Sequence, residues 1–381
     1  MGSVSIQRCA DYSEQNIAEA LEKCFNDIGG VEKYIKPGMK VLLKPNLVMK
    51  KDPAEAATTH PALIKVLCGI IRRVGASAII ADSPGGVYSE KVLKSLYAVC
   101  GMSKVGENAI LNYDTSSVDI DVPDGKLLKK VTIIKPLADA DLVINLPKLK
   151  THGQMVYTGA VKNMFGAVPG ALKAEYHFRM QNYEDFADAL IDIFLSIKPG
   201  LTIMDAVYGM EGEGPTAGTP RYIGALLAGE NAFEVDLAAL KLIKVKPGSV
   251  PLIKQAIRRG LCPEDINSIK IFGGNIDEMV IDNFNVPGLN TLRAIEFFDK
   301  GIIKFAINRI KPKPVFNHGK CVGCGDCMSV CPAGVIRMND GKPSADLSKC
   351  IRCFCCQELC PIKAINIKRS SIIKLISGRT R

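Results

Sequence analysis

Tryptophan is absent from this sequence of 381 residues, and aromatic residues make up only 6% of it. Their scarcity argues against nucleic-acid or sugar sites that depend on stacked rings. Long apolar runs are also missing, because stretches such as 187–197 are interrupted by aspartate and are too short to cross a bilayer. The first eleven residues lack the apolar core of a signal peptide. We therefore expect a soluble, cytoplasmic protein without a transmembrane segment.

Three motifs that mark common enzyme classes are not found. The glycine-rich segment 209–218 lacks the G-K-[ST] ending of a Walker loop, and no G-x-G-x-x-G follows the first expected strand. A G-x-S-x-G nucleophile motif is missing as well. The sequence therefore gives no support for a P-loop NTPase, a Rossmann dinucleotide site or a serine hydrolase.

Cysteine, in contrast, is abundant, and eight of the 14 cysteines form two copies of one motif. Each copy reads C-x2-C-x2-C-x3-C-P, the spacing typical of bacterial [4Fe–4S] proteins. The copies comprise Cys321, Cys324, Cys327 and Cys331 before Pro332, and Cys350, Cys353, Cys356 and Cys360 before Pro361. Two four-cysteine zinc sites are the alternative, but zinc has no use for a third C-x2-C step that ends in C-x3-C-P. We expect two [4Fe–4S] clusters.

The two motifs are an internal repeat in which Cys321 recurs as Cys350, 29 positions later. In such paired runs the fourth cysteine of one run binds the cluster of the other run. The first cluster is therefore expected to use Cys321, Cys324, Cys327 and Cys360. The second cluster is expected to use Cys350, Cys353, Cys356 and Cys331. Cys355 matches no motif position, and we interpret it either as a bystander thiol or as a substitute ligand for Cys356.

The net charge of +10 is concentrated near the C-terminus, where residues 315–381 contain eleven Lys and Arg against four Asp and Glu. Basic residues at this place offset the negative charge of thiolate-bound clusters. A nucleic-acid patch is the alternative, but we expect no nucleic acid as a partner. Two basic amphipathic segments, 291–310 and 370–381, either pack on the protein itself or contact a membrane surface.

Strand and helix patterns alternate through the first 290 residues, with short apolar strands such as 40–43 and 201–204 and amphipathic helices such as 183–197. This alternation is typical of an α/β domain whose mostly parallel sheet is covered by helices. We divide the chain into a large α/β domain (1–290), an amphipathic helix with a KPKP linker (291–314), a small α+β two-[4Fe–4S] ferredoxin-like domain (315–369) and a basic tail (370–381).

Polar residues follow several of the expected strands, at the edge where open α/β sheets bind ligands. Lysines beside asparagines suit an anionic substrate such as a carboxylate or a phosphate, and the acidic residues suit charge balance or a divalent metal. The residues expected to bind substrate or cofactor are Lys44, Asn46, Asp82, Asn163, Asp205 and Glu211. The catalytic candidates are Lys148, His152 and Lys162, with His152 or a carboxylate handling the proton.

Each of these features also has a purely structural interpretation. Asp82-Ser83-Pro84 has the composition of a turn with a helix cap. Lys148 and Lys150 are equally consistent with a solvated loop, and His60 with a residue that only precedes a helix.

Four segments together resemble the family called domain of unknown function 362, over roughly residues 3–284. They are KPNLV (44–48), DSPGG (82–86), NLPKLKTH (145–152) and GAVKNMFG (159–166). Residues 315–369 resemble a bacterial two-[4Fe–4S] ferredoxin, a module that many members of this family carry. The resemblance implies the architecture and the choice of loops, but no reaction. Such ferredoxins are commonly acidic, so the basic module here is expected to be a fixed electron wire with an acidic ferredoxin or flavodoxin as donor.

These observations predict an iron–sulfur oxidoreductase, most simply a reductase. Single electrons would pass through the two clusters to a small anionic substrate or a second cofactor in the large domain. The alternative is a non-catalytic electron-transfer or maturation partner whose large domain binds another protein. A third interpretation gives the clusters a structural role only.

Overall fold

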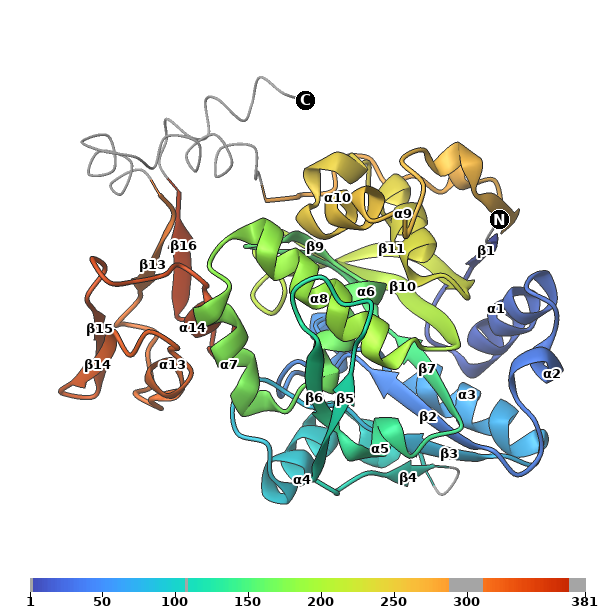
Figure 1. Ribbon diagram of the computed structural model, residues 1–381, viewed down its shortest axis with the longest axis horizontal. Coiled ribbons are helices and arrows are strands. Elements are labelled where there is room, and N and C mark those ends of the chain that lie inside the picture. Colours follow the sequence, from blue (N-terminus) through green and yellow to red (C-terminus); the bar gives the residue numbers. More distant parts are fainter. Residues whose placement is uncertain (1–2, 107–108, 288–310, 370–381) are drawn as a thin grey trace.

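A ten-stranded sheet forms the centre of the large domain in the computed structural model, which describes residues 3–106, 109–287 and 311–369. Its strands are β1 (Ser3–Arg8), β2 (Lys40–Pro45), β3 (Ser77–Ile80), β4 (Ile110–Leu111), β7 (Leu142–Leu146), β8 (Lys148–His152), β9 (Val156–Thr158), β10 (Leu201–Glu211), β11 (Thr219–Gly229) and β12 (Lys270–Gly273). The main path runs in the order β12-β1-β11-β10-β7-β2-β3-β4 (Figure 1). Within the series β4-β3-β2-β7-β10, each strand is parallel to the next one. Strand β11 is antiparallel to both of its neighbours, β1 and β10. The expected mostly parallel sheet is therefore confirmed.

Helices cover both faces of the sheet (Figure 1). One face carries α1 (Glu14–Asp27), α3 (Pro61–Arg73) and α4 (Glu90–Val99), and the other carries α6 (Ala160–Asn163), α8 (Tyr183–Ile197), α9 (Ala232–Leu242) and α10 (Pro251–Arg258). Successive residues of β2 point to opposite faces, so that Val41 and Leu43 join one hydrophobic core and Leu42 joins the other. Burial on both faces explains why these strands are almost continuously apolar in sequence.

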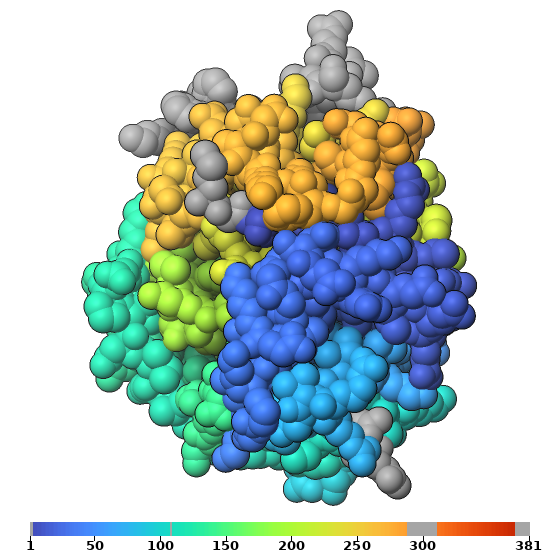
Figure 2. Space-filling model, turned by 90° about the vertical axis from the view of Figure 1, so that its right-hand side faces the viewer, coloured from blue at the N-terminus to red at the C-terminus, as the bar shows by residue number. Residues whose placement is uncertain are grey.

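Shorter elements connect the layers. They are α2 (Val31–Tyr34), α5 (Lys135–Ala138), α7 (Gly170–Arg179), the antiparallel pair β5 (Ser117–Asp121) and β6 (Lys130–Ile134), and the 3-10 helices η1 (Pro53–Glu55), η2 (Met102–Lys104), η3 (Met164–Ala167), η4 (Pro247–Ser249), η5 (Ile266–Ser268) and η6 (Ile276–Glu278). N-terminal residues in blue and the segment that follows α9 in orange form the upper and central parts of the face shown in Figure 2.

Side chains at the start of the helices fix where several of them begin. Ser13, Ser89 and Asn182 each accept a hydrogen bond from a backbone N–H in the first turn of α1, α4 and α8, respectively. His60 has the same role for α3, because its Nδ1 accepts the Ala62 N–H at 3.2 Å. The structure therefore agrees with the structural interpretation of His60, because its ring caps the start of α3.

Two segments of the large domain differ from the sequence expectation. Residues Lys148–His152 form strand β8 with every side chain buried, not a loop, because β8 lies between β10 and β9. Helix α7 is not predicted from the sequence at all, although Gly170–Arg179 consists largely of residues that favour helices. Both differences affect the position of candidate site residues.

A small module follows the large domain. It consists of β13 (Lys313–Phe316), α13 (Asp326–Ser329), β14 (Ile336–Asn339), β15 (Lys342–Ala345), α14 (Cys355–Glu358) and β16 (Ile365–Lys368), with β13 antiparallel to β16 and β14 antiparallel to β15. This small α+β architecture agrees with the ferredoxin-like expectation. Because β13 begins at Lys313, the last two residues of the expected linker belong to the module. The basic segments 291–310 and 370–381 lie outside the described residues.

Hydrogen bonds and ion pairs attach the module to the large domain, next to α7 (Figure 1). In α14, the backbone oxygen of Glu358 accepts from Thr216 Oγ1 at 2.6 Å, and Gln357 Nε2 donates to the backbone oxygen of Glu213 at 3.2 Å. Further along the chain, Lys363 pairs with Glu55 at 2.9 Å. The contacts from α14 are short and partly buried, so they fix this helix against the large domain.

Candidate functional site

Two small cavities in the module each lie among four cysteines. The first is lined by Cys321, Cys324, Cys327 and Cys360, and the second by Cys331, Cys350, Cys353 and Cys356. These are the same crossed sets that the sequence spacing predicts. The remaining lining residues are mostly apolar, so each cavity offers four sulfur ligands within an apolar shell. This donor set fits a [4Fe–4S] cluster.

The chain winds around both cavities in the same way. Gly323 and Gly325 have left-handed φ values of 75° and 81°, and a Cβ on Gly323 would lie 2.8 Å from the backbone oxygen of Gly341. In the second half, Arg352 and Phe354 adopt the same conformation with φ values of 59° and 61°. In the described ranges, no three His, Cys, Asp or Glu side chains converge on a single metal position. The cysteines are instead spread around a space, as a multi-atom cluster requires.

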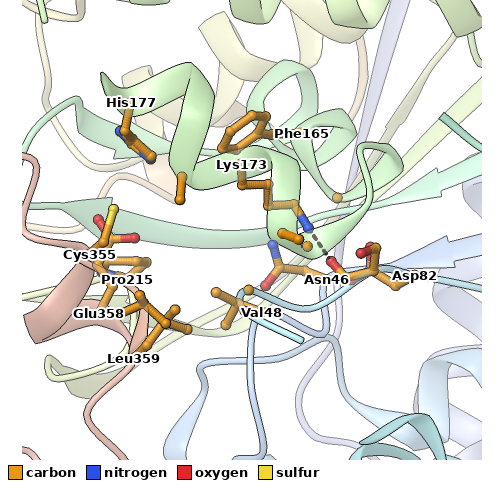
Figure 3. A pocket seen from close by; sticks show the side chains of 18 of the residues that line it. Asn46, Val48, Asp82, Phe165, Lys173, His177, Pro215, Cys355, Glu358 and Leu359 are labelled. Carbon is orange, nitrogen blue, oxygen red and sulfur yellow. Dashed lines mark hydrogen bonds between the residues drawn. The ribbon is translucent and has the colours of Figure 1, made fainter. Parts of the chain in front are cut away.

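A larger cavity of about 290 Å³ lies between the module and the large domain. Ser329 and Val330 contribute to its wall on the module side. Cys355, Glu358 and Leu359 form the rest of this wall, and Cys355 is next to residues that line the second cysteine cavity. Figure 3 shows them opposite Asn46 and Asp82 of the large domain. Cys355 therefore contributes to the cavity between the domains, whereas its neighbours in the sequence line the cluster site.

The polar wall of the large domain is held together by its own hydrogen bonds. Lys150 Nζ donates to Asn46 Oδ1 at 2.8 Å and to the backbone oxygen of Ala57 at 2.7 Å. Asn46 Nδ2 donates to Asn163 Oδ1 at 2.9 Å, and Asn163 Nδ2 continues to Asn145 Oδ1 at 2.8 Å. Burial, followed by repulsion from neighbouring lysines, lowers the pKa of Lys150 to about 7. Three of the predicted segments thus meet in one network.

Lys44 and Asp82 form a buried ion pair behind this wall. Lys44 Nζ lies 2.7 Å from Asp82 Oδ1, and Asp82 Oδ2 accepts the Leu47 N–H at 2.6 Å. Burial lowers the pKa of Lys44, and the Asp82 carboxylate counteracts this effect. Asp82 reaches the cavity, but the Lys44 ammonium is already paired. The pair therefore fixes the ends of β2 and β3 rather than offering a free cation.

Lys162 is the catalytic candidate that the structure brings to the cavity. Its side chain is partly buried and its Nζ lies 5.6 Å from the ring centroid of Phe165. Within the described part of the chain, its ammonium has no hydrogen-bond acceptor. Burial lowers the pKa of Lys162, whereas the nearby Glu358 and Cys355 raise it. The unbonded ammonium points to the binding of a negatively charged group.

Lys148 and Asp205 form a second buried pair away from the cavity wall. Lys148 Nζ donates to Asp205 Oδ2 at 2.9 Å and to the Tyr12 hydroxyl at 2.6 Å. The Tyr12 hydroxyl donates in turn to Asp205 Oδ1 at 2.8 Å, and its ring stacks on His60 at 3.6 Å. Neither member of the pair lines the cavity. The solvated-loop interpretation is wrong for Lys148, which is fully buried in β8.

His152 lies behind Glu358 and does not line the cavity itself. Its Nδ1 accepts the backbone N–H groups of Gln154 at 3.1 Å and Met155 at 3.2 Å, which leaves the proton of the neutral ring on Nε2. Nε2 lies 3.3 Å from Glu358 Oε1. Burial lowers the pKa of His152 far below its usual value, and burial raises the pKa of Glu358 to about 7. His152 can therefore influence the cavity only through Glu358.

Glu211 is a further predicted ligand that the structure places outside the cavity lining, as it does Lys44 and Asp205. Its Oε2 accepts the Asn285 N–H at 2.9 Å at the far end of β10, and it does not line the cavity between the domains. The extension of β10 to Glu211 carries this residue away from the others.

Helix α7 adds two cavity residues that the sequence reasoning does not single out. Lys173 Nζ donates to the backbone oxygens of Ser83 at 2.5 Å and Pro84 at 3.0 Å, and burial lowers its pKa to about 7. His177 lies one turn further, with its ring 4.5 Å from that of Phe186, and burial lowers its pKa to about 3. Figure 3 shows both side chains at the cavity. A lysine and a histidine four positions apart in a run of helix-forming residues were the available signal.

Two family comparisons match different parts of the chain. Residues 41–241 match the family described as Domain of unknown function (DUF362), and residues 313–361 match the 4Fe-4S dicluster domain. Both resemblances inferred from the motifs are therefore confirmed. The dicluster match also covers β13, in agreement with the start of the module at Lys313.

The relatives give less detail. A thylakoid-associated protein of Synechocystis sp. is 30% identical over 307 residues, which cover 77% of this chain and 90% of the relative. The structure of the lactate racemase apoprotein of Thermoanaerobacterium thermosaccharolyticum has a TM-score of 0.37 and 15% identity, and the match covers 60% of this chain and 54% of that chain. The cytoplasmic location stays a prediction. Within the described ranges, no helix is long and apolar enough to span a membrane.

Proposed function

Because the chain belongs to the DUF362 family and carries a 4Fe-4S dicluster domain, we propose that it is a reductase with an interdomain substrate site. Two [4Fe–4S] clusters, when bound, supply single electrons. A small anionic molecule in the cavity between the domains receives them. An acidic ferredoxin or flavodoxin is the proposed external donor.

One observation carries this proposal: the cavity has cluster-binding chain on one side and an unbonded lysine on the other. Cys355 and Glu358 of α14 line the cavity, and Cys356 in the same helix lines the second cysteine cavity. Lys162 lies in the opposite wall without a hydrogen-bond acceptor among the described residues. A molecule bound to Lys162 would therefore lie beside α14, the helix that also lines the second cysteine cavity.

The chain's own residues have separate tasks in this proposal. Lys162 binds the negative group, and Lys173 adds a second amine from α7. Phe165 and Leu359 supply apolar surface that excludes water from the bound molecule. Lys148 and His152 act as positioning residues, because Lys148 is paired with Asp205 and His152 reaches the cavity only through Glu358.

The experiment is substrate-dependent reoxidation of the reduced, anaerobically reconstituted protein. Unsaturated carboxylates and keto acids are offered in turn, and the absorbance of the clusters is followed. Lys162→Met should slow reoxidation by the active compound about tenfold or more, because a charged group loses its buried ion partner. Lys23→Met, on the exposed surface of α1, is the matched control and should leave the rate unchanged.

Two results would count against a reductase. Equal rates of reoxidation in the Lys162→Met variant and the wild type would show that Lys162 does not bind the substrate, and the observation that carries the proposal would be lost. Failure of every small molecule, together with a stoichiometric protein partner in pull-downs, would favour the alternative of an electron-transfer or maturation partner.

A further inference from the structure

The two halves of the module repeat in sequence but differ in exposure. Cys324 and Cys353 are equivalent positions, yet Cys324 is exposed whereas Cys353 is only 7% exposed. Met328 is 45% exposed, whereas its counterpart Gln357 is 2% exposed. One half of a symmetric unit is thus covered and the other is left open.

The large domain is the cause of this difference. Gln357 donates to the backbone of Glu213, and Cys355 lines the cavity between the domains. Asp326, the counterpart of Cys355, lies exposed on α13. The second cysteine cavity therefore lies beside the proposed substrate site, and the first cysteine cavity borders on solvent.

The exposed surface over the first cysteine cavity has an apolar centre. We define the open face as the exposed residues that line this cavity: Val322, Cys324, Asp326, Pro361 and Ile362. Val322 is 69% exposed and Ile362 is 37% exposed. Apolar side chains that are surrounded by a rim of polar residues are typical of protein-binding surfaces.

The module that carries the open face has an excess of positive charge. The described module, residues 311–369, contains ten Lys and Arg against four Asp and Glu. Lys320 is exposed directly beside Cys321, and Lys342 donates to the backbone oxygen of Cys321 at 2.7 Å. A positive field of this kind accelerates the approach of a negatively charged partner.

We infer that the open face is the docking surface for an acidic one-electron carrier protein. Electrons then enter at the first cysteine site and leave from the second site towards the cavity. This direction follows from exposure, because Cys324 of the first set is exposed, whereas the cysteines of the second set are buried or half-buried. The inference rests on the electron-transfer part of the proposed function, but not on the substrate in the cavity.

The test measures reduction of the clusters without any substrate, by stopped-flow absorbance. The donors are a reduced acidic two-[4Fe–4S] ferredoxin and, separately, reduced methyl viologen. The variant is Val322→Glu with Ile362→Glu, and the matched control places the same charges at Ile110 and Leu127, which are 60% and 43% exposed on the large domain. Iron content establishes that each protein is loaded.

The double variant should be reduced at least tenfold more slowly by the ferredoxin, and this loss should be at least fivefold larger than any loss of its viologen rate. Binding of the oxidised ferredoxin, measured by calorimetry, should weaken by a similar factor and should weaken in the wild type as salt increases. Asp326→Asn should change the ferredoxin rate in the opposite direction. If the double variant loses iron, Lys320→Glu is the variant to measure.

Equal ferredoxin rates in the variant and the wild type would overturn the inference, as would an equal loss in the Ile110 and Leu127 control. A loss of the viologen rate of the same size would assign the effect to the cluster itself rather than to docking. Because no substrate is present, this experiment can succeed even if the cavity binds no small molecule.

Discussion

Replacing Lys148 tests whether this lysine stabilises the fold or takes part in chemistry. Its ammonium and the Asp205 carboxylate are both fully buried and 2.9 Å apart. Removing one partner of such a pair costs about 3–5 kcal/mol, because the other charge stays buried without compensation. The remaining hydrogen bonds decide where in this range each single variant falls.

In Lys148→Met, the Asp205 carboxylate keeps three donors. They are the Tyr12 hydroxyl at 2.8 Å, the His60 N–H at 2.9 Å and the Val207 N–H at 3.3 Å. We therefore expect a loss near the lower end, about 3 kcal/mol. In Asp205→Leu, the Tyr12 oxygen is the one hydrogen-bond partner that the Lys148 ammonium keeps among the described residues, so the expected loss is about 5 kcal/mol.

The assay is thermal and urea unfolding followed by circular dichroism on the loaded protein under anaerobic conditions. A loss of about 3 kcal/mol corresponds to a Tm lower by roughly 6–12 °C for a domain of this size class. The double variant Lys148→Met with Asp205→Leu should lose less than the two single losses together, since neither charge is then left alone. An unchanged Tm in Lys148→Met, with substrate-dependent reoxidation abolished, would refute the structural role.

Two further predictions concern the cavity. Cys355→Ala should retain about eight irons per chain, whereas Cys353→Ala should lose iron. The reason is that Cys353 lines the second cysteine cavity and Cys355 does not. Equal iron loss in both variants would make Cys355 a ligand. Affinity for an anionic ligand, measured by calorimetry, should fall as pH rises through about 7, because Lys173 loses its proton there under the combined effect of burial, Asp82, Lys44 and Lys162. A lysine with a lowered pKa is charged below that value, so the sign is tighter binding at low pH. Lys173→Met should reduce this pH dependence without removing it, because Lys150 and Glu358 also line the cavity and have pKa values of about 7. An unchanged profile would exclude Lys173 as one of the titrating groups.

The grouping of the cysteines could be predicted almost completely from the sequence, because they follow a local spacing. The crossing of Cys331 and Cys360 between the two sets follows from the same rule, and the cavities group the cysteines in this way. The mostly parallel sheet was also predictable, because strands buried on both faces leave near-continuous apolar runs.

The large-domain site was predictable only as a set of loops. Lys148 and Lys162 look alike in the sequence, each in a short polar segment between apolar stretches. Lys148 meets Asp205 because β8 lies beside β10, whereas Lys162 meets no acceptor in the described part of the chain. Local patterns contain no information on which partner a strand will have. The free lysine could therefore not be distinguished from the paired one.

Helix α7 was missed for a related reason, since its role depends on how closely it approaches the loop of residues 82–86. A Cβ on Gly170 would lie 2.4 Å from the backbone oxygen of Gly86 and 2.5 Å from that of Pro84. Backbone atoms cannot move aside as the end of a side chain can, so α7 can begin here only with glycine. The same approach lets Lys173 reach Ser83 and Pro84. Gly170 thus allows the α7 amine to reach the cavity wall, and this effect becomes visible only once the two segments are in contact.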